Sequence, residues 1–148
     1  MGEFEMIDIN YSLRIAYQTA LSGIAGVPVF YQTVPSNISP QNYIVFRSIT
    51  NNDASTVNSS DTNTTIVVEI HTWDDNLNNG LSADIVAREV FNRIYPNRQF
   101  NLTIDGAQIV QTQLSNDTTQ NFSNNQNRSY ISRFLTFRHN IFQRSDIS

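Results

Sequence analysis

The sequence predicts an α+β fold, a mostly antiparallel sheet with two helices packed on one face, in the order α-β-β-β-α-β-β-β. Three observations lead to this prediction. Apolar residues recur with helical spacing in two stretches, residues 10–24 and 83–94, and alternate with polar residues elsewhere. Two polar runs, 51–63 and 115–127, each connect two predicted strands. We therefore expect a single domain over residues 1–148 with two long polar hairpin loops and flexible tails at 1–8 and 143–148.

The first helix is expected over residues 10–24, with Asp8 or Asn10 as its N-cap and Gly23 and Gly26 near its end. Its apolar side consists of Leu13, Ala16, Tyr17, Ala20, Leu21 and Ile24. A short extended segment follows at 27–31. The prolines of the turn at 35–40 exclude a central strand there, so the next strand is predicted at 43–50.

Residues 64–96 form the central unit, in which a strand leads into the second helix. Ile66, Val68 and Ile70 fall on one face of the strand, and the other face carries Val67, Glu69, His71 and Trp73. After a turn at 74–76 the spacing becomes helical, with Asn79-Gly80 at the helix entry. The apolar stripe of this helix ends before Pro96 and consists of Ala83, Val86, Ala87, Val90, Phe91 and Ile94.

The sequence pattern in the last third of the chain predicts three strands. The first, at 100–104, is joined to the second, at 107–114, by Asp105-Gly106, a dipeptide typical of tight hairpins. A long strand follows the second polar run and covers residues 129–142.

Composition excludes several classes of function. The chain has no cysteine, so disulfides, thiolate metal sites and cysteine nucleophiles are excluded, and only His71 and His139 supply imidazoles. All nine basic residues are arginines dispersed along a chain of net charge −4, which argues against wrapping nucleic acid. No apolar run is long enough to span a membrane, and the acidic N-terminus differs from a signal peptide, so we expect a soluble protein.

One cluster has residues suited to acid/base or metal chemistry: Glu69, His71, Asp74 and Asp75. A small metal-dependent or acid/base enzyme is therefore the alternative function. The structural interpretation is favoured, in which Glu69 and His71 are solvated or interface positions while Asp74 and Asp75 turn the chain and cap the helix. No nucleophile elbow, phosphate loop or calcium loop occurs, so we predict no catalytic residue, metal ligand or cofactor.

A nucleic-acid platform on the last strand is also disfavoured. Alternation places Tyr130 and Phe134 on one face with Arg138, but Arg133 and Phe137 on the other, so basic and aromatic side chains do not combine on one surface.

The two polar runs are predicted to be the working parts, because loops of this length are uncommon unless they are functional or disordered. We expect deletion of 51–63 to leave the fold intact. The candidate interface residues are Asn51, Asn52, Asp53, Thr56, Asn58, Asp61 and Asn63 in the first run and Asn116, Asp117, Asn121, Phe122 and Asn125 in the second.

The element order, together with "NYIVFRSI" before the first polar run, "IVVEIHTWDD" after it and "ADIVAREVFNRIY" in the second helix, resembles the tail terminator and tail-completion proteins of long-tailed bacteriophages and related neck proteins. The resemblance covers residues 11–142 and rests on element order and hydrophobic pattern. The chain departs from that family in its Asn-rich runs and its lack of Lys.

The resemblance implies a non-enzymatic virion protein that forms a homo-oligomeric ring at the head–tail junction. Such rings are commonly hexameric, and some neck rings are twelve-fold. They cap the tail tube and join it to the head connector, with DNA passing through the lumen as cargo. We accordingly expect the protein to assemble in the cytoplasm of the host bacterium, without a membrane partner.

Overall fold

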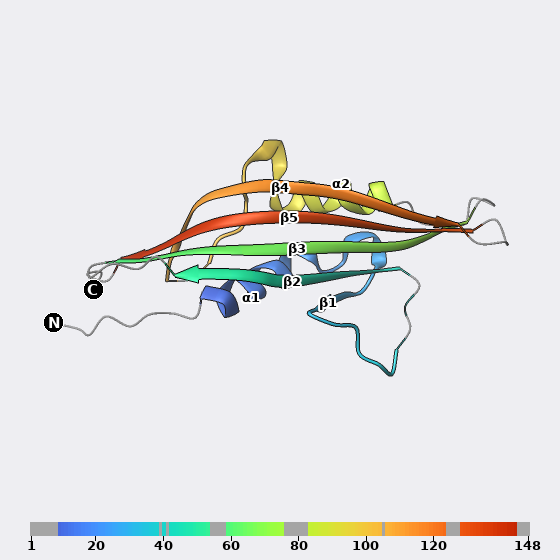
Figure 1. Cartoon of the computed structure of the whole chain (residues 1–148), viewed down its shortest axis with the longest axis horizontal. Coiled ribbons are helices and arrows are strands. Elements are labelled where there is room, and N and C mark those ends of the chain that lie inside the picture. Colours follow the sequence, from blue (N-terminus) through green and yellow to red (C-terminus); the bar gives the residue numbers. More distant parts are fainter. Residues whose placement is uncertain are drawn as a thin grey trace.

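The computed structural model describes residues 9–38, 40, 42–53, 59–75, 83–104, 106–123 and 128–144 (Figure 1). Two α-helices, α1 (Ile9–Leu21) and α2 (Ala83–Ile94), are each followed by a short 3₁₀ turn, η1 (Ile24–Gly26) and η2 (Pro96–Arg98). The strands are β1 (Val29–Tyr31), β2 (Tyr43–Asp53), β3 (Ser59–Asp75), β4 (Gln108–Ser123) and β5 (Arg128–Arg144). The predicted α+β class is confirmed.

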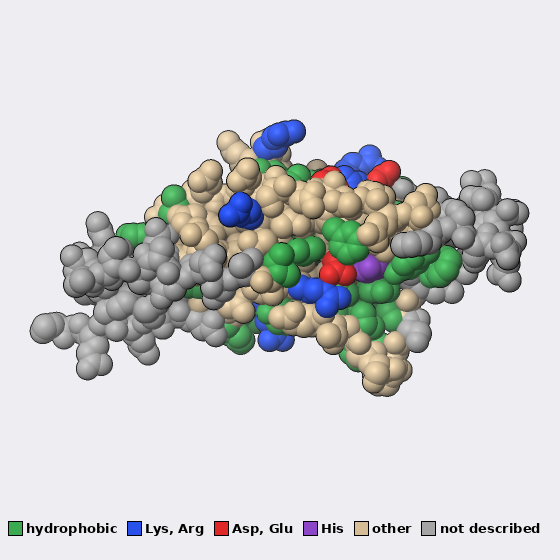
Figure 2. Space-filling model, viewed as in Figure 1, with side chains coloured by type: hydrophobic (Ala, Val, Ile, Leu, Met, Phe, Trp, Pro, Cys, Tyr) green, Lys and Arg blue, Asp and Glu red, His purple; other side chains and the backbone are tan. Residues whose placement is uncertain are grey.

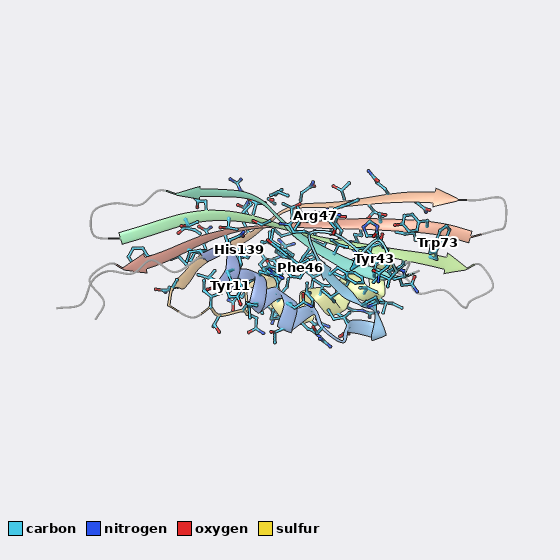
Figure 3. The ribbon with its side chains drawn as sticks, turned by 90° about the horizontal axis from the view of Figure 1, so that it is seen from below. Tyr11, Tyr43, Phe46, Arg47, Trp73 and His139 are labelled. Atoms are coloured by element: carbon cyan, nitrogen blue, oxygen red, sulfur yellow. The ribbon has the colours of Figure 1, made fainter. Side chains whose placement is uncertain are left out.

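The strands form one sheet in the order β1-β2-β3-β5-β4. β1 pairs with β2 in parallel, and the other three pairings are antiparallel. Both helices lie on the same face of this sheet, as Figure 3 shows from the side, and the opposite face carries no helix among the described residues. We call these the covered face and the uncovered face.

The predicted helices form where their apolar stripes meet the sheet. In α1 the buried residues are Ile9, Leu13, Tyr17 and Leu21, and in α2 they are Ala83, Val86, Ala87, Val90 and Ile94. Gly23 follows α1 with φ +80°, a left-handed conformation that glycine adopts without steric cost. α2 ends two residues before Pro96, and the Asn101 N–H donates to the Ile94 carbonyl at 2.9 Å.

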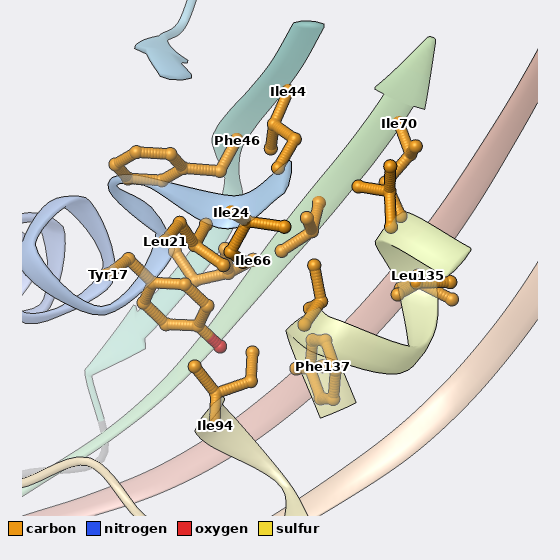
Figure 4. Packing of buried hydrophobic residues seen from close by; sticks show 14 of the residues in the cluster. Tyr17, Leu21, Ile24, Ile44, Phe46, Ile66, Ile70, Ile94, Leu135 and Phe137 are labelled. Atoms are coloured by element: carbon orange, nitrogen blue, oxygen red, sulfur yellow. The ribbon is translucent and has the colours of Figure 1, made fainter. Parts of the chain in front are cut away.

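The core lies between the helices and the covered face (Figure 4). Ile66, Val68 and Ile70 of β3 are at most 1% exposed, so the predicted alternation of this strand is confirmed. Phe46 of β2, Leu135 and Phe137 of β5 and the helix stripes complete the cluster. Burying such a side chain contributes about 1.5–3 kcal/mol each, which makes this layer the main source of stability.

The prediction of two thirteen-residue loops is wrong. β2 continues through residues 51–53 and β3 begins at Ser59, so most of the first run belongs to strands, with pairs such as Asn51↔Thr64 and Asp53↔Thr62. The second run lies mostly in β4, which extends to Ser123, and β5 begins at Arg128. Backbone hydrogen bonds between strands need no apolar side chain, and Thr favours extended backbone, so a polar run can continue a ladder that its neighbours have started.

These strand extensions form two arms that point in opposite directions. The β2–β3 hairpin extends past the helices at one end of the sheet, and the β4–β5 hairpin extends past them at the other (Figure 1). At 17 residues each, β3 and β5 span about 55 Å. Deletion of 51–63 would remove paired segments of both β2 and β3, so the expectation that it leaves the fold intact no longer holds.

Residues 100–104 are not a strand, although their alternation predicts one. Phe100, Leu102 and Ile104 pack partly buried against the core, and the Phe100 ring lies 4.5 Å from the His139 ring. Alternation reports which side chains are buried but not whether a neighbouring backbone is available for pairing. Of the predicted Asp105-Gly106 turn, Asp105 lies outside the described residues, while Gly106 lies in a turn with φ +81° shortly before β4 and does not join two strands.

Asp74 and Asp75 are the last two residues of β3, paired with Ser129 and Arg128, rather than a turn and helix cap. The long partner strand β5 continues the ladder beyond the point where the polarity of the sequence predicts a turn. Asn79-Gly80, the predicted helix entry, lies outside the described residues.

Candidate functional site

The uncovered face of the sheet carries the candidate residues Glu69 and His71. Most of this face is polar, but hydrophobic side chains gather at one part of it beside acidic, basic and histidine groups (Figure 2). They come from neighbouring strands at matching register positions, for example Tyr43↔His71 and His71↔Ser132. We call Tyr43, Arg47, Glu69, His71, Trp73, Tyr130, Ser132 and Phe134 the open-face cluster.

Glu69 is the anionic centre of this cluster. Its Oε2 accepts a hydrogen bond from Arg47 Nε at 2.5 Å, and its Oε1 lies 3.1 Å from His71 Nε2. Burial by itself raises the pKa of Glu69, but hydrogen bonds from His71 and Arg47 and the Arg47 charge outweigh it and lower that pKa. An ionised carboxylate can only accept hydrogen bonds, so the His71 nitrogen that faces it, Nε2, carries the proton.

The other nitrogen of His71 is also engaged. Nδ1 lies 2.8 Å from both Ser132 Oγ and Tyr130 Oη. The ring stacks between Tyr43, at 4.7 Å, and Tyr130, at 5.9 Å, with the Phe134 edge at 6.0 Å. Burial and a hydrogen bond with Tyr130 raise the pKa of Tyr43 to about 12, so this phenol stays protonated.

The polar groups of Glu69 and His71 are held in a closed network. Glu69 and His71 are only 13% and 12% exposed, and every one of their polar side-chain atoms has a partner inside the cluster. No group of three or more possible metal ligands occurs in the described part of the chain. Glu69 and His71 do come together as predicted, whereas the side chains of Asp74 and Asp75 lie outside the described residues.

His139 lies on the covered face, so the two histidines cannot share a site. Its Nε2 lies 2.6 Å from the Tyr17 hydroxyl and its Nδ1 lies 2.8 Å from Thr112 Oγ1. Burial lowers the pKa of His139 to about 3, which keeps the ring neutral. The sequence does not indicate this link among α1, β4 and β5, but His139 alternates in step with the buried residues Phe137 and Ile141, which places its side chain in the core.

Arg133 joins the second helix to the edge of the sheet. It contacts Asp84 of α2 at 2.9 Å and binds both carboxylate oxygens of Asp117 on β4 at 2.9 and 2.7 Å. The hydrogen bond and charge of Asp117 raise the pKa of Arg133 further. Asp117 therefore has an intramolecular role, while Arg133 and Arg138 fall on opposite faces, as predicted.

The other predicted interface residues are distributed along the arms. Asn63 is exposed and its Oδ1 accepts from Asn140 Nδ2 at 2.9 Å, and Asn116 Oδ1 accepts from Thr118 Oγ1 at 3.1 Å. Asn121 is exposed on β4. The remaining residues lie in β2, β3 or β4 with undescribed side chains (Asn51, Asn52, Asp53, Asp61 and Phe122) or outside the described residues (Thr56, Asn58 and Asn125).

A polar hollow of about 250 Å³ lies at the start of the β2–β3 arm. Its lining includes Asn63, Gln111, Gln113, Arg138 and Asn140. Thr64, Thr65 and His139 also line it. The amides, the hydroxyls and the guanidinium can donate or accept hydrogen bonds, and both ring nitrogens of His139 are already bonded to Tyr17 and Thr112. The chemistry of the hollow is that of polar contact.

Comparison with known proteins bears on the fold. No protein-family model and no curated protein matches the chain. Among solved structures, a chain of the virion of a native gene transfer agent particle matches with a TM-score of 0.65, and the alignment covers 93% of this chain and 99% of that chain. The two chains share a fold. They are 16% identical, so the similarity lies in the arrangement of elements rather than in particular side chains.

Neither helix of the described residues has the length and apolarity needed to cross a bilayer.

Proposed function

We propose that this protein is a structural subunit of a phage-like particle, and that it forms a ring at the head–tail junction as a tail terminator or neck protein. The observation that supports a virion role is the likeness to a gene transfer agent virion chain, which extends over nearly the full length of both chains. A whole-domain match of this kind is more informative than a shared motif, because no extra domain remains in that chain to account for a different use of the fold.

The described site supports a structural role. Glu69 and His71 are satisfied within the open-face cluster, and the ring contacts of the cluster join β2, β3 and β5. Each arm extends past the helices and exposes polar side chains, for example Asn63 on one arm and Asn121 on the other. Rigid projections with hydrated surfaces are suited to joining subunits that must stay dissolved before assembly.

The proposed partners are further copies of this chain, a tail tube protein and a head connector protein. A six-fold ring is the main proposal, with a twelve-fold neck ring as its alternative, and DNA is cargo that passes through the lumen. The function proposed for the chain requires assembly and no catalysis.

The test is the state of the purified protein, alone and mixed with tail tube or connector proteins from the same particle. Light scattering after size exclusion gives the mass, and negative-stain imaging gives symmetry and diameter. We expect rings in at least one of these mixtures. A monomer that associates with neither partner would contradict the proposal.

A further inference from the structure

The sheet has two unpaired backbone edges, and they lie on opposite sides of it. β4 is the terminal strand of the described sheet on one side. On the other side β1 is terminal, but it pairs only with residues 44–46 of the eleven-residue strand β2. Residues 48–53 of β2 therefore form a second edge with no strand beside it in the described part of the chain. An unpaired edge presents N–H and C=O groups that can pair with another chain.

The free edge of β4 is long and regular in its second half. Register shifts interrupt its pairing with β5 between Ile109 and Gln111 and between Leu114 and Asn116. From Asn116 to Ser123 the pairing is uninterrupted, and residues 115–121 are all exposed. This segment contains neither proline nor a basic residue, the usual devices that prevent edge-to-edge pairing. Its one charged side chain, Asp117, is bound to Arg133.

The two free edges have compatible directions. β4 runs parallel to β3, since both are antiparallel to β5, and β2 runs opposite to β3. A second copy in the same orientation would therefore place its β2 antiparallel to β4 of the first. Residues 48–53 also lack proline and basic residues. The pairing of this segment with β3 has one register shift, between Ser48 and Thr50, and is regular over residues 50–53.

The two edge segments are also offset from each other along the strand direction. Through β5, residues 116–123 of β4 align with residues 67–74 of β3, whereas residues 50–53 of β2 align with 62–65. The offset is roughly 20 Å at about 3.3 Å per residue. Joined copies would therefore be staggered along the strand direction. A sheet can close into a barrel when its strands are staggered in register and tilted relative to the barrel axis.

We infer that residues 116–123 of β4 pair with residues 48–53 of β2 in a second copy of this chain, so that the sheet continues from subunit to subunit. The inference rests on the proposed function, because a contact between two different edges repeats head to tail and can close into a ring. Pairing of β4 with β4 would instead give a closed dimer. Polar edge residues keep the free subunit hydrated until the backbone groups find their partners.

The absence of cysteine from the chain provides a direct test, because any engineered thiol is unique. The variants are Ile49→Cys on β2 and Gln120→Cys on β4, joined by a flexible bis-maleimide that tolerates the unspecified register. Ile49 is 57% exposed and Gln120 is exposed, so both thiols can react. The matched control is Ile85→Cys, at an exposed apolar position of α2 on the covered face.

We expect covalent dimers when the Ile49→Cys and Gln120→Cys proteins are mixed under ring-forming conditions, and a ladder up to the ring size for the double variant. Each single variant alone should stay monomeric in the denaturing gel. Cross-linking of Gln120→Cys with itself, or equal cross-linking with Ile85→Cys, would overturn the inference. Rings that form without cross-linking of the mixture would overturn the edge pairing alone, whereas absence of rings from the unaltered chain would count against the proposed function.

Proline substitution gives a second readout. Adjacent residues of an antiparallel edge strand point their N–H groups alternately toward the partner strand and away from it. Thr118→Pro and Thr119→Pro should therefore differ: one loses a bond to β5 and is destabilised, and the other keeps its thermal unfolding midpoint but loses ring formation. Unchanged ring formation in the stable variant would contradict the inference.

Discussion

The two faces of the sheet hold the two histidines of the chain in opposite environments. On the covered face His139 is 2% exposed, lies among Tyr17, Thr112 and Phe100, and burial lowers its pKa to about 3. On the uncovered face His71 shares a network with an ionised carboxylate, an arginine and two hydroxyls. The buried apolar layer therefore stabilises one side of the sheet, and polar groups that satisfy one another line the other side.

The largest expected effect tests the burial of the covered face. Phe46→Ala should lower the free energy of unfolding by about 3–5 kcal/mol, because Phe46 is fully buried beneath Tyr17 and Tyr31. Ile49→Ala, on the same strand but 57% exposed, should change it by less than about 0.5 kcal/mol. Urea unfolding measures both. Equal losses for the two variants would show that the Ile49 side chain is also packed.

The next effect tests the neutral state of His139. Between its unfolded pKa of 6.5 and its folded pKa of about 3, the unfolded chain binds a proton that the native chain does not. Stability should therefore fall as pH falls through this range, by about 2 kcal/mol between pH 6.5 and 4.5. Urea unfolding over that range measures the slope.

The control for this pH dependence is a pair of variants. His139→Gln removes the titrating ring and should remove that part of the slope, whereas His71→Gln should leave the contribution of His139 in place. If His139→Gln keeps the full slope, another group titrates. Below pH 4.5 the lowered pKa of Glu69 adds a further loss in the same direction, since its stabilisation is present only while the carboxylate is ionised.

A smaller effect probes the polar network of the uncovered face. Glu69→Gln keeps the shape but removes the charge that Arg47 and His71 contact, and should cost about 1–2 kcal/mol. Glu89→Gln, the same change on α2, should cost less than about 0.5 kcal/mol. Thermal or urea unfolding compares the two variants. A neutral result for Glu69→Gln would mean that solvent replaces the network without loss.

The smallest effect concerns the contact between α2 and Arg133. Asp84 is 83% exposed, so Asp84→Asn should change stability by less than about 0.5 kcal/mol. Asp117→Asn should cost more, up to about 1 kcal/mol, because it breaks a two-point contact at a less exposed position. A double-mutant cycle with Arg133 measures each coupling. A larger coupling for Asp84 would contradict this order.

The spacing of apolar residues correctly predicted the features of the fold that depend on burial. It failed to predict which segments are strands where backbone pairing decides this. The stripe of α2 and the alternation of β3 follow from which residues leave water, and the structure confirms both. Residues 100–104 alternate in the same way, yet they pack against the core without a partner strand. The arms show the converse error: residues 51–53 and 116–123 have no alternation of apolar residues in the sequence, but they pair because β3 and β5 extend beside them.

Part of the candidate site could be predicted from the sequence and part could not. Alternation places Glu69 beside His71, and their 3.1 Å contact confirms that pairing. Sequence spacing cannot indicate that Arg47, Tyr130 and Ser132 complete the cluster, because these residues come from strands whose register is set by tertiary pairing.

The α+β class, the helices with their inward stripes and the division of β3 into an apolar and a polar face follow from the sequence, because they depend on local spacing and on the transfer of apolar groups from water. The strand order, the length of the arms and the two free edges depend on tertiary pairing between strands. Backbone hydrogen bonds carry no side-chain signature, so a strand of Asn, Thr and Gln is recognised only once its neighbour is in place.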